Sequence, residues 1–150
     1  MTGAAARDAD SIVAAIASVM ARAPEVAAAY LFGSVARGTA TIESDLDVGV
    51  VYRDRRSDAH DRLATSLALE LSRATGFERV DLVDLEAQGS IFALRVLSDG
   101  KRAYEGHRER RIDFESETIS RGLDFLPTYE LATRDKPAAL RRWLEERYGL

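Results

Sequence analysis

The stretch LFGSVARGTATIESDLDVGVVY, from Leu31 to Tyr52, constrains the fold more than any other part of the chain. Leu31 and Phe32 close one predicted strand, and the apolar run from Val48 to Tyr52 continues another. Between them, a Gly-Ser turn that leads into a helix presents free backbone N–H groups and a hydroxyl to an anion. The sequence therefore predicts a strand, a turn, a short helix and a second strand, with polar residues at the strand ends.

Asp45 and Asp47 open the second of these strands. Residues two apart on a strand point to the same face, with their Cα atoms roughly 7 Å apart. Two carboxylates so placed can hold a pair of Mg²⁺ ions about 3.5–4 Å apart. The pattern predicts a phosphate cradle at Gly33 and Ser34 beside a metal-binding carboxylate pair. The alternatives are an ordinary turn with a helix cap, and a solvated start of a strand.

Arg37 lies in the same GSVARG segment, one helical turn from Ser34. From there its guanidinium can reach an anion held at the helix start, which makes it a candidate phosphate ligand; a plain surface charge is the equally open alternative. His60 and His107 are the only histidines, and neither has a spacing typical of a metal pair or a catalytic triad. We therefore expect both histidines on the surface.

Apolar periodicity predicts an α/β (α+β) fold in which helices flank a small mixed sheet. The predicted helices are 12–20, 63 to about 76, and 91–97, and the predicted strands are 26–32, 48–52, 79–85 and, at an edge, 102–104. We expect a single domain over 1–150, with a catalytic core at about 10–105 and a helical tail at about 106–150. In that tail, Asp135 to Pro137 resembles the start of a last helix that runs through Leu144.

Composition narrows the class of protein. A net charge of −4 and a pI near 5.3 argue against broad nucleic-acid binding, which depends on neutralising phosphates with Lys and Arg. The absence of Cys excludes disulfides and thiolate metal sites and is compatible with a reducing cytoplasm. No segment approaches the roughly 18 continuous apolar residues of a membrane span. We expect a soluble cytoplasmic protein without direct nucleic-acid or membrane binding.

The motifs GSVARG and SDLDVGVV together resemble the signature of the DNA polymerase β-type nucleotidyltransferase superfamily, and most closely its minimal nucleotidyltransferase (MNT) branch. The resemblance is strong up to Leu85 and weaker beyond it. That family places a third carboxylate on a neighbouring strand, and ERVDLVDL supplies Asp81 for this role. Asp84 lies on the opposite strand face from Asp81, so we interpret it as a surface residue.

The resemblance also implies roles for these residues. Asp45 and Asp47 would bind two Mg²⁺ ions, and Asp81 would complete the second metal site and help to deprotonate the acceptor. Gly33 and Ser34 would hold the phosphates of ATP, the nucleotide donor. Gly49 departs from the family pattern, in which a larger apolar residue is usual, and it either weakens its strand or admits a close-packed neighbour.

The MNT branch includes antitoxins that inactivate HEPN ribonuclease toxins by transferring AMP from ATP to a tyrosine. Antibiotic-modifying relatives usually append a helical domain that binds the drug, whereas only 69 residues follow Asp81 here. We therefore expect a protein acceptor, namely a cognate HEPN-type toxin in a hetero-oligomer with this chain. Two alternatives remain: a standalone transferase acting on a small molecule such as an aminoglycoside, and an antitoxin that neutralises by binding alone.

Overall fold

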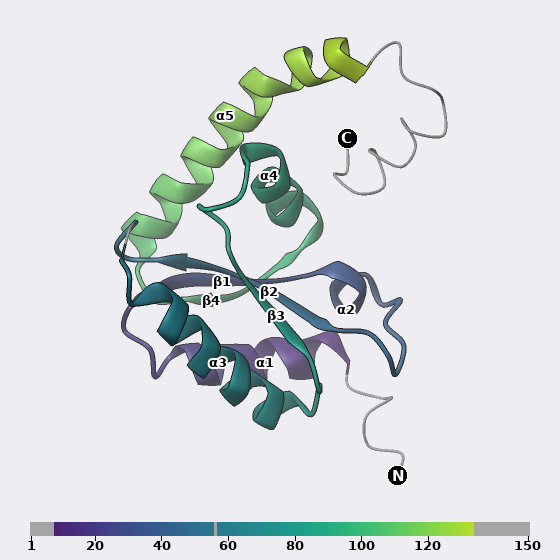
Figure 1. The fold of residues 1–150 in the computed structure, drawn as a ribbon, viewed down its shortest axis with the longest axis vertical. Coiled ribbons are helices and arrows are strands. Elements are labelled where there is room, and N and C mark those ends of the chain that lie inside the picture. The colour runs from purple at the N-terminus through teal and green to yellow at the C-terminus, as the bar shows by residue number, and fades with distance from the viewer. Residues whose placement is uncertain (1–7, 56, 134–150) are drawn as a thin grey trace.

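The computed structural model of the protein describes residues 8–55 and 57–133. A mixed four-stranded sheet lies between two pairs of helices, with α1 and α3 on one face and α4 and α5 on the other (Figure 1). The strands are β1 (Val26–Phe32), β2 (Leu46–Tyr52), β3 (Val80–Asp84) and β4 (Lys101–Glu105), and the helices are α1 (Ala9–Met20), α2 (Gly33–Arg37), α3 (His60–Thr75), α4 (Ser90–Asp99) and α5 (Arg108–Thr133). This confirms the predicted fold class, while the helix predicted from Asp135 lies outside the described residues.

The strand order β3-β2-β1-β4 decides which strand ends meet. β1 pairs antiparallel with both β2 and β4, whereas β2 pairs parallel with β3. The end of β1 therefore lies beside the starts of β2 and β3. Gly33, which follows β1, is brought close to Asp47 near the start of β2, and Asp47 is in turn the register partner of Asp81 on β3. β4 lies at an edge of the sheet, as predicted for residues 102–104.

Each face of the sheet has its own core, because alternate residues of a strand point in opposite directions. On the side of α1 and α3, Val48 and Val50 pack with Ile16 and Leu71. On the side of α4 and α5, the buried residues are Ala27, Ala28, Tyr30, Val51, Leu85, Ala93, Val96 and Phe114. Burial of β1 on both faces explains why its sequence, VAAAYLF, is apolar throughout rather than alternating.

Gly49 sits in the middle of β2 for a packing reason. A Cβ at this position would meet the side chain of Leu85 at 2.7 Å. Of the two outcomes expected for this glycine, a close-packed neighbour is the one observed. Leu85 is 1% exposed and belongs to the core on the side of α4, so Gly49 makes room for a core residue.

The two histidines differ from the expectation that both lie on the surface. The ring of His60 stacks on Tyr52, with 3.9 Å between ring centroids, and its side chain is only 13% exposed. That prediction was wrong because the fold brings the start of α3 against the end of β2, a contact that no local pattern reports. His107 is half-buried, and its Nδ1 accepts a hydrogen bond from the backbone N–H of Arg110 (3.2 Å) at the start of α5.

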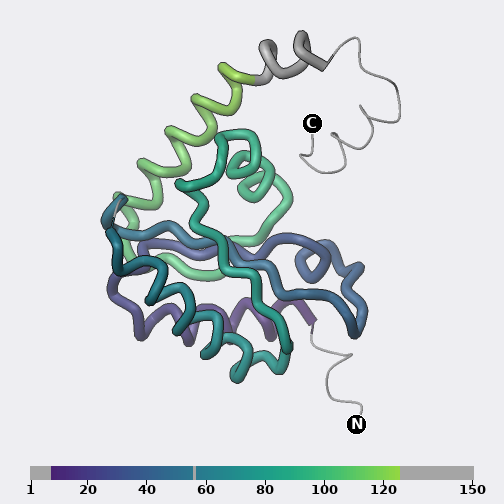
Figure 2. The backbone as a smooth tube through the Cα atoms, in the orientation of Figure 1, coloured from purple at the N-terminus to yellow at the C-terminus, as the bar shows by residue number. Residues whose placement is uncertain are grey.

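Helix α5 begins beside the start of β1, where the N–H groups of Gly106 and His107 both donate to the carbonyl of Ala27. It then runs past α4 and away from the sheet, as the backbone trace in Figure 2 makes clear. Within the described part of the chain, none of the helices has the length and apolar character needed to cross a bilayer.

Candidate functional site

The turn after β1 is built around Gly33. This residue has φ 77°, in the left-handed region that residues with a Cβ rarely adopt. A Cβ at Gly33 would also overlap the carboxylate of Asp47. Glycine is therefore required for two independent reasons, the turn itself and the close approach of a carboxylate to the backbone.

Ser34 follows in the first turn of α2. Phe32 holds the N-cap position, and no side chain caps this helix. The Ser34 carbonyl accepts a hydrogen bond from the N–H of Thr39 (2.9 Å), whereas its hydroxyl has no hydrogen bond to another described residue. The structure thus departs from the alternative in which Ser34 is an ordinary helix cap, and the half-buried hydroxyl is available to a ligand.

Asp47 and Asp81 are register partners on the parallel strands β2 and β3. Burial, and after it the negative charges of Asp81 and Asp45, together raise the pKa of Asp47 to about 6. Partners in register present their side chains on the same sheet face, so the two carboxylates are neighbours. The structure therefore brings together two of the three predicted carboxylates, at an energetic cost to the charged form of Asp47.

Arg37 is the cation that opposes the rise in the pKa of Asp47. Its positive charge lowers the pKa of Asp47, so it lies within electrostatic range of the carboxylate. The residue is exposed at the last turn of α2. Its predicted contact with phosphate stays a prediction.

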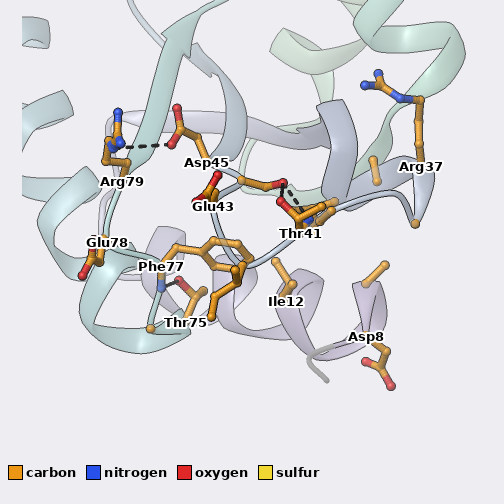
Figure 3. A pocket seen from close by; sticks show the side chains of 18 of the residues that line it. Asp8, Ile12, Arg37, Thr41, Glu43, Asp45, Thr75, Phe77, Glu78 and Arg79 are labelled. Carbon is orange, nitrogen blue, oxygen red and sulfur yellow. Dashed lines mark hydrogen bonds and ion pairs between the residues drawn. The ribbon is translucent and has the colours of Figure 1, made fainter. Parts of the chain in front are cut away.

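Asp45 departs from its predicted place on the strand, because β2 begins one residue later, at Leu46. β1 pairs with β2 only as far as the partners Phe32 and Asp47, since the chain turns away at Gly33. Asp45 is therefore in the loop before β2, and its Oδ1 lies 3.8 Å from Nε of Arg79 (Figure 3). Both side chains are well exposed, at 45% and 81%, so this is a weak surface pair.

Arg79 was missed by the sequence analysis. It precedes β3, and its carbonyl accepts a hydrogen bond from the N–H of Leu46 (3.0 Å), which extends the pairing of β2 and β3 by one residue. A signal for it existed: if Asp47 pairs with Asp81 on parallel strands, then the residue two before Asp81 comes beside Asp45. The predicted pairing of Asp47 with Asp81 thus implied that Arg79 lies next to Asp45.

The three carboxylates suit a hard divalent cation in chemistry, since Mg²⁺ prefers carboxylate oxygen. The burial and like charge that raise the pKa of Asp47 are also what a bound cation would relieve. Among the described residues, no three His, Cys, Asp or Glu side chains are already arranged around one point that could hold a metal ion. Asp45 is paired with Arg79, so this pair would have to open before Asp45 could bind a cation.

Asp84 provides a contrast on the same strand as Asp81. Its carboxylate accepts a hydrogen bond from the N–H of Glu86 (3.1 Å), and its Oδ2 lies 3.9 Å from Nδ1 of His60 on α3. It therefore faces α3, away from Asp47, as strand alternation predicted. With 29% of its side chain exposed, it is half-buried rather than a plain surface residue.

A pocket of about 1340 Å³ opens beside this site. It lies between the start of α1, the loop from α2 to β2, and the segment from α3 to β3 (Figure 3). Ile12 and Phe77 contribute apolar side chains, while Arg37 and Arg79 line it from opposite sides, with Asp45 next to Arg79. Of the candidate site residues, Arg37 and Asp45 line this pocket, whereas Gly33, Ser34, Asp47 and Asp81 do not, so the pocket is a neighbour of the carboxylate site and is not the site itself.

The sequence of this chain is similar to those of known nucleotidyltransferases. Residues 14–109 match the family described as polymerase beta, nucleotidyltransferase. Protein adenylyltransferase MntA of Shewanella oneidensis is 33% identical over 98 residues, which cover 65% of this chain and 66% of the relative. The match spans just under two thirds of that relative's length.

Solved structures are similar as well. A toxin-antitoxin structure with AMP-PNP contains a chain that is 28% identical, with a TM-score of 0.61 over 79% of this chain and 91% of that one. The complex of the tri-AMPylated Shewanella oneidensis HEPN toxin with its MNT antitoxin gives 26% identity and a TM-score of 0.56, over 79% and 88% of the two chains. These similarities confirm the resemblance to MNT proteins, and the match over residues 14–109 shows that the chain belongs to the polymerase beta nucleotidyltransferase family.

Proposed function

We propose that this chain is an antitoxin that transfers AMP from ATP to a tyrosine of a cognate HEPN-type toxin, with which it forms a hetero-oligomer. The observation that carries the proposal is the register pair Asp47 and Asp81 beside the Gly33 turn, in a chain similar to a protein adenylyltransferase. The similar complexes support the nucleotide and the partner, since one holds AMP-PNP and another a tri-AMPylated HEPN toxin.

The reaction is an in-line displacement at phosphorus. The tyrosine oxygen forms a bond to the α-phosphorus of ATP, the bond from that phosphorus to the pyrophosphate oxygen breaks, and pyrophosphate leaves. The phenolic proton passes to a carboxylate, for which Asp81 is the candidate because it is exposed at the start of β3. No redox change or further reactant is required.

Asp45, Asp47 and Asp81 would hold two Mg²⁺ ions, and Gly33, Ser34 and Arg37 would bind the phosphates. Bound Mg²⁺ supplies neutralisation of the triphosphate and of the charge that develops during transfer. Asp45 can join the other carboxylates if its pair with Arg79 opens, which costs little because exposed ion pairs contribute only about 0–1 kcal/mol. The free hydroxyl of Ser34 and the required glycine at position 33 support the phosphate assignment.

The family match ends at residue 109 and α5 begins at Arg108. We propose a single domain over 1–150 with a catalytic core at about 10–105 and a helical tail at about 106–150, and this agreement supports the boundary between core and tail. The core carries every residue proposed for chemistry, which leaves the tail for another task.

The test compares two aspartates of one strand. A candidate HEPN-type toxin is incubated with this chain, ATP and Mg²⁺, and the intact mass of the toxin is measured. We expect a gain in whole AMP units with wild type and with Asp84→Ala, and no gain with Asp81→Ala. Asp84→Ala is the matched control because it removes the same group from the opposite face of β3.

Two results would replace the proposal. A complex without any mass gain, combined with neutralisation of the toxin, would favour an antitoxin that acts by binding alone. The absence of both complex and mass gain would favour a small-molecule acceptor, to be sought among aminoglycosides with the same Asp81→Ala control.

A further inference from the structure

Helix α5 has two faces of different character. Its inner face packs against the fold: Phe114 and Thr118 are 3% and 7% exposed, and a Cβ at Gly122 would meet Leu94 of α4 at 2.8 Å. Its outer face carries Ile112, Ile119 and Leu123, which are 41%, 45% and 56% exposed. We call these three residues the outer stripe.

The outer stripe is continuous along the helix. Its members are spaced by seven and then four residues, which at about 100° per residue keeps them within roughly 40° of one another. The stripe therefore covers about 16 Å of helix, and its centre lies roughly 80–160° around the helix from the buried positions Phe114, Thr118 and Gly122. Apolar side chains in this heptad-like spacing are typical of a helix that packs against another helix.

Charge on one flank of the stripe indicates the kind of partner. Glu109, Asp113 and Asp124 are exposed and fall on the same side of the stripe by helical spacing. Arg110 and Arg111, in contrast, face inward, where they contact Glu86, Glu105 and Glu115. The outer face of α5 thus combines an apolar stripe with an acidic edge on one flank, while the exposed Arg108 lies on the other flank at the start of the helix.

A second copy of this chain fits that face poorly. Antiparallel pairing of two identical α5 helices about a two-fold axis would set one acidic edge against the other, and like charges facing each other are unfavourable. An amphipathic helix with a basic edge complements both the stripe and the charge.

We propose that the outer stripe of α5 is the docking surface for such a basic-edged amphipathic helix on the protein acceptor. The inference rests on the proposed function for the existence of that acceptor, and it adds where the acceptor is held. The acceptor is the HEPN-type toxin, recognised through apolar contact with Ile119 and Leu123 and through cations placed against Glu109 and Asp124.

Docking on α5 leaves the carboxylates free. The helix starts beside Ala27 at the beginning of β1, whereas Gly33 follows the other end of this strand, and the six residue steps between them span roughly 20 Å. A toxin held on α5 therefore presents its tyrosine on a separate segment. Such an arrangement suits repeated transfer to one bound acceptor, because the docked surfaces need not separate between transfers.

The test uses the full chain with Ile119→Asp and Leu123→Asp combined. The matched control is Leu69→Asp on α3, an apolar residue that is 52% exposed on the opposite side of the sheet. Titration calorimetry measures the Kd for the HEPN-type toxin that the mass assay identifies as the acceptor, and AMP transfer to that toxin gives kcat and KM. We expect the double variant to raise both Kd and KM at least about tenfold with little change in kcat, while the control leaves all three unchanged.

A separate variant tests the acidic edge. Glu109→Lys combined with Asp124→Lys should weaken binding several-fold and reduce its dependence on salt, because the reversed charges face the basic edge of the partner.

The remaining outcomes distinguish the two proposals. If wild type binds the toxin and the double variant binds it equally well, the docking surface is refuted and the proposed function stands. If wild type does not bind the toxin at all, the proposed function fails and the docking surface with it. If the double variant has an unchanged Kd for the toxin but a lower Tm, the stripe instead contacts residues 134–150 of this chain, and the docking proposal is wrong. If the double variant has half the wild-type mass in sedimentation, the stripe instead contacts a second copy of this chain, and the docking proposal is again wrong.

Discussion

At one end of the sheet like charges lie together, whereas at the other end charged side chains are paired with opposite charges. At the end of β1, where β2 and β3 start, the carboxylates of Asp47 and Asp81 are neighbours with Asp45 close by, and burial and like charge raise the pKa of Asp47 to about 6. The opposing positive charges are Arg37, which lowers the pKa of Asp47, and Arg79, which forms a weak pair with Asp45. This arrangement costs stability in the protein by itself.

At the other end, charges are matched. Arg110, with 10% of its side chain exposed, pairs with Glu86 and donates from Nε to the carbonyl of Arg53 (3.2 Å). Arg55 links the same Glu86 (3.9 Å) to Glu117 on α5 (3.0 Å). The network joins α5 to the loops after β2 and β3. Buried charges that are paired in this way serve the fold, whereas like charges gathered without compensation indicate a ligand of opposite charge.

The largest expected effect comes from removing the Asp47 carboxylate. We expect Asp47→Ala to reduce AMP transfer at least about a thousandfold, equivalent to about 4 kcal/mol of activation free energy, because the site loses its most buried carboxylate. The protein should remain folded, since no buried pair is broken. Initial rates of transfer and thermal melting measure the two effects. A variant that retained wild-type rates would contradict the role of this end of the sheet.

Arg110→Ala tests the other end of the sheet, where charged side chains are paired. Removing the buried guanidinium leaves Glu86 short of a partner, so we expect the free energy of unfolding to fall by about 3 kcal/mol, with the transfer rate of the folded enzyme unchanged. Denaturant titration measures the loss. Arg55→Ala, at a side chain that is 52% exposed, is the control and should cost less than about 1 kcal/mol. Equal costs for the two variants would show that burial is not what matters.

Gly33→Ala and Gly38→Ala separate backbone strain from the approach of Asp47. Both glycines have positive φ, 77° and 74°, but a Cβ at Gly38 meets nothing within 4 Å, while one at Gly33 overlaps the Asp47 carboxylate. Strain alone should cost each variant about 1–2 kcal/mol. Only Gly33→Ala should also displace Asp47 and impair transfer. Comparable transfer rates in the two variants would argue against a role for the close approach.

Asp47→Asn should have the smallest of the expected effects, a pH-dependent change in the free energy of unfolding. Because the pKa of Asp47 is raised from 3.8 to about 6, the folded state binds this proton more tightly than the unfolded chain, and stability falls as the pH rises through that window. Without Mg²⁺ at pH 7, the amide should therefore stabilise the protein by about 1 kcal/mol, a figure reduced for solvent screening because Asp47 is only half-buried. Below about pH 4 the gain should vanish, as thermal melts across pH would reveal.

Much of the fold was predictable because local and periodic signals agreed. The apolar spacing in α1 and the left-handed Gly76 after α3 marked helices correctly. Strand alternation also separated Asp81 from Asp84, and the structure puts Asp84 against His60 on the other face. These features depend on neighbours a few residues apart, which a sequence displays directly.

What the sequence could not reveal depends on contacts between distant segments. Asp45 falls outside β2 because the turn at Gly33 removes its strand partner, and no pattern around Asp45 reports where β1 ends relative to β2. The burial of His60 arises from stacking on Tyr52, and the pairing of Arg110 with Glu86 joins residues 24 positions apart. Of the site, the residue types were predictable from the motifs, whereas the present direction of Asp45 was not.

The most direct test of the account is the titration of the Asp47 carboxyl group by NMR, with and without Mg²⁺. We predict a pKa of about 6 in the metal-free protein, which falls when Mg²⁺ is added because a bound cation favours the carboxylate. Asp84, followed in the same spectra, should not respond to Mg²⁺. An Asp47 with an ordinary pKa that is indifferent to Mg²⁺ would contradict the claim that this end of the sheet gathers like charges in order to hold a cation.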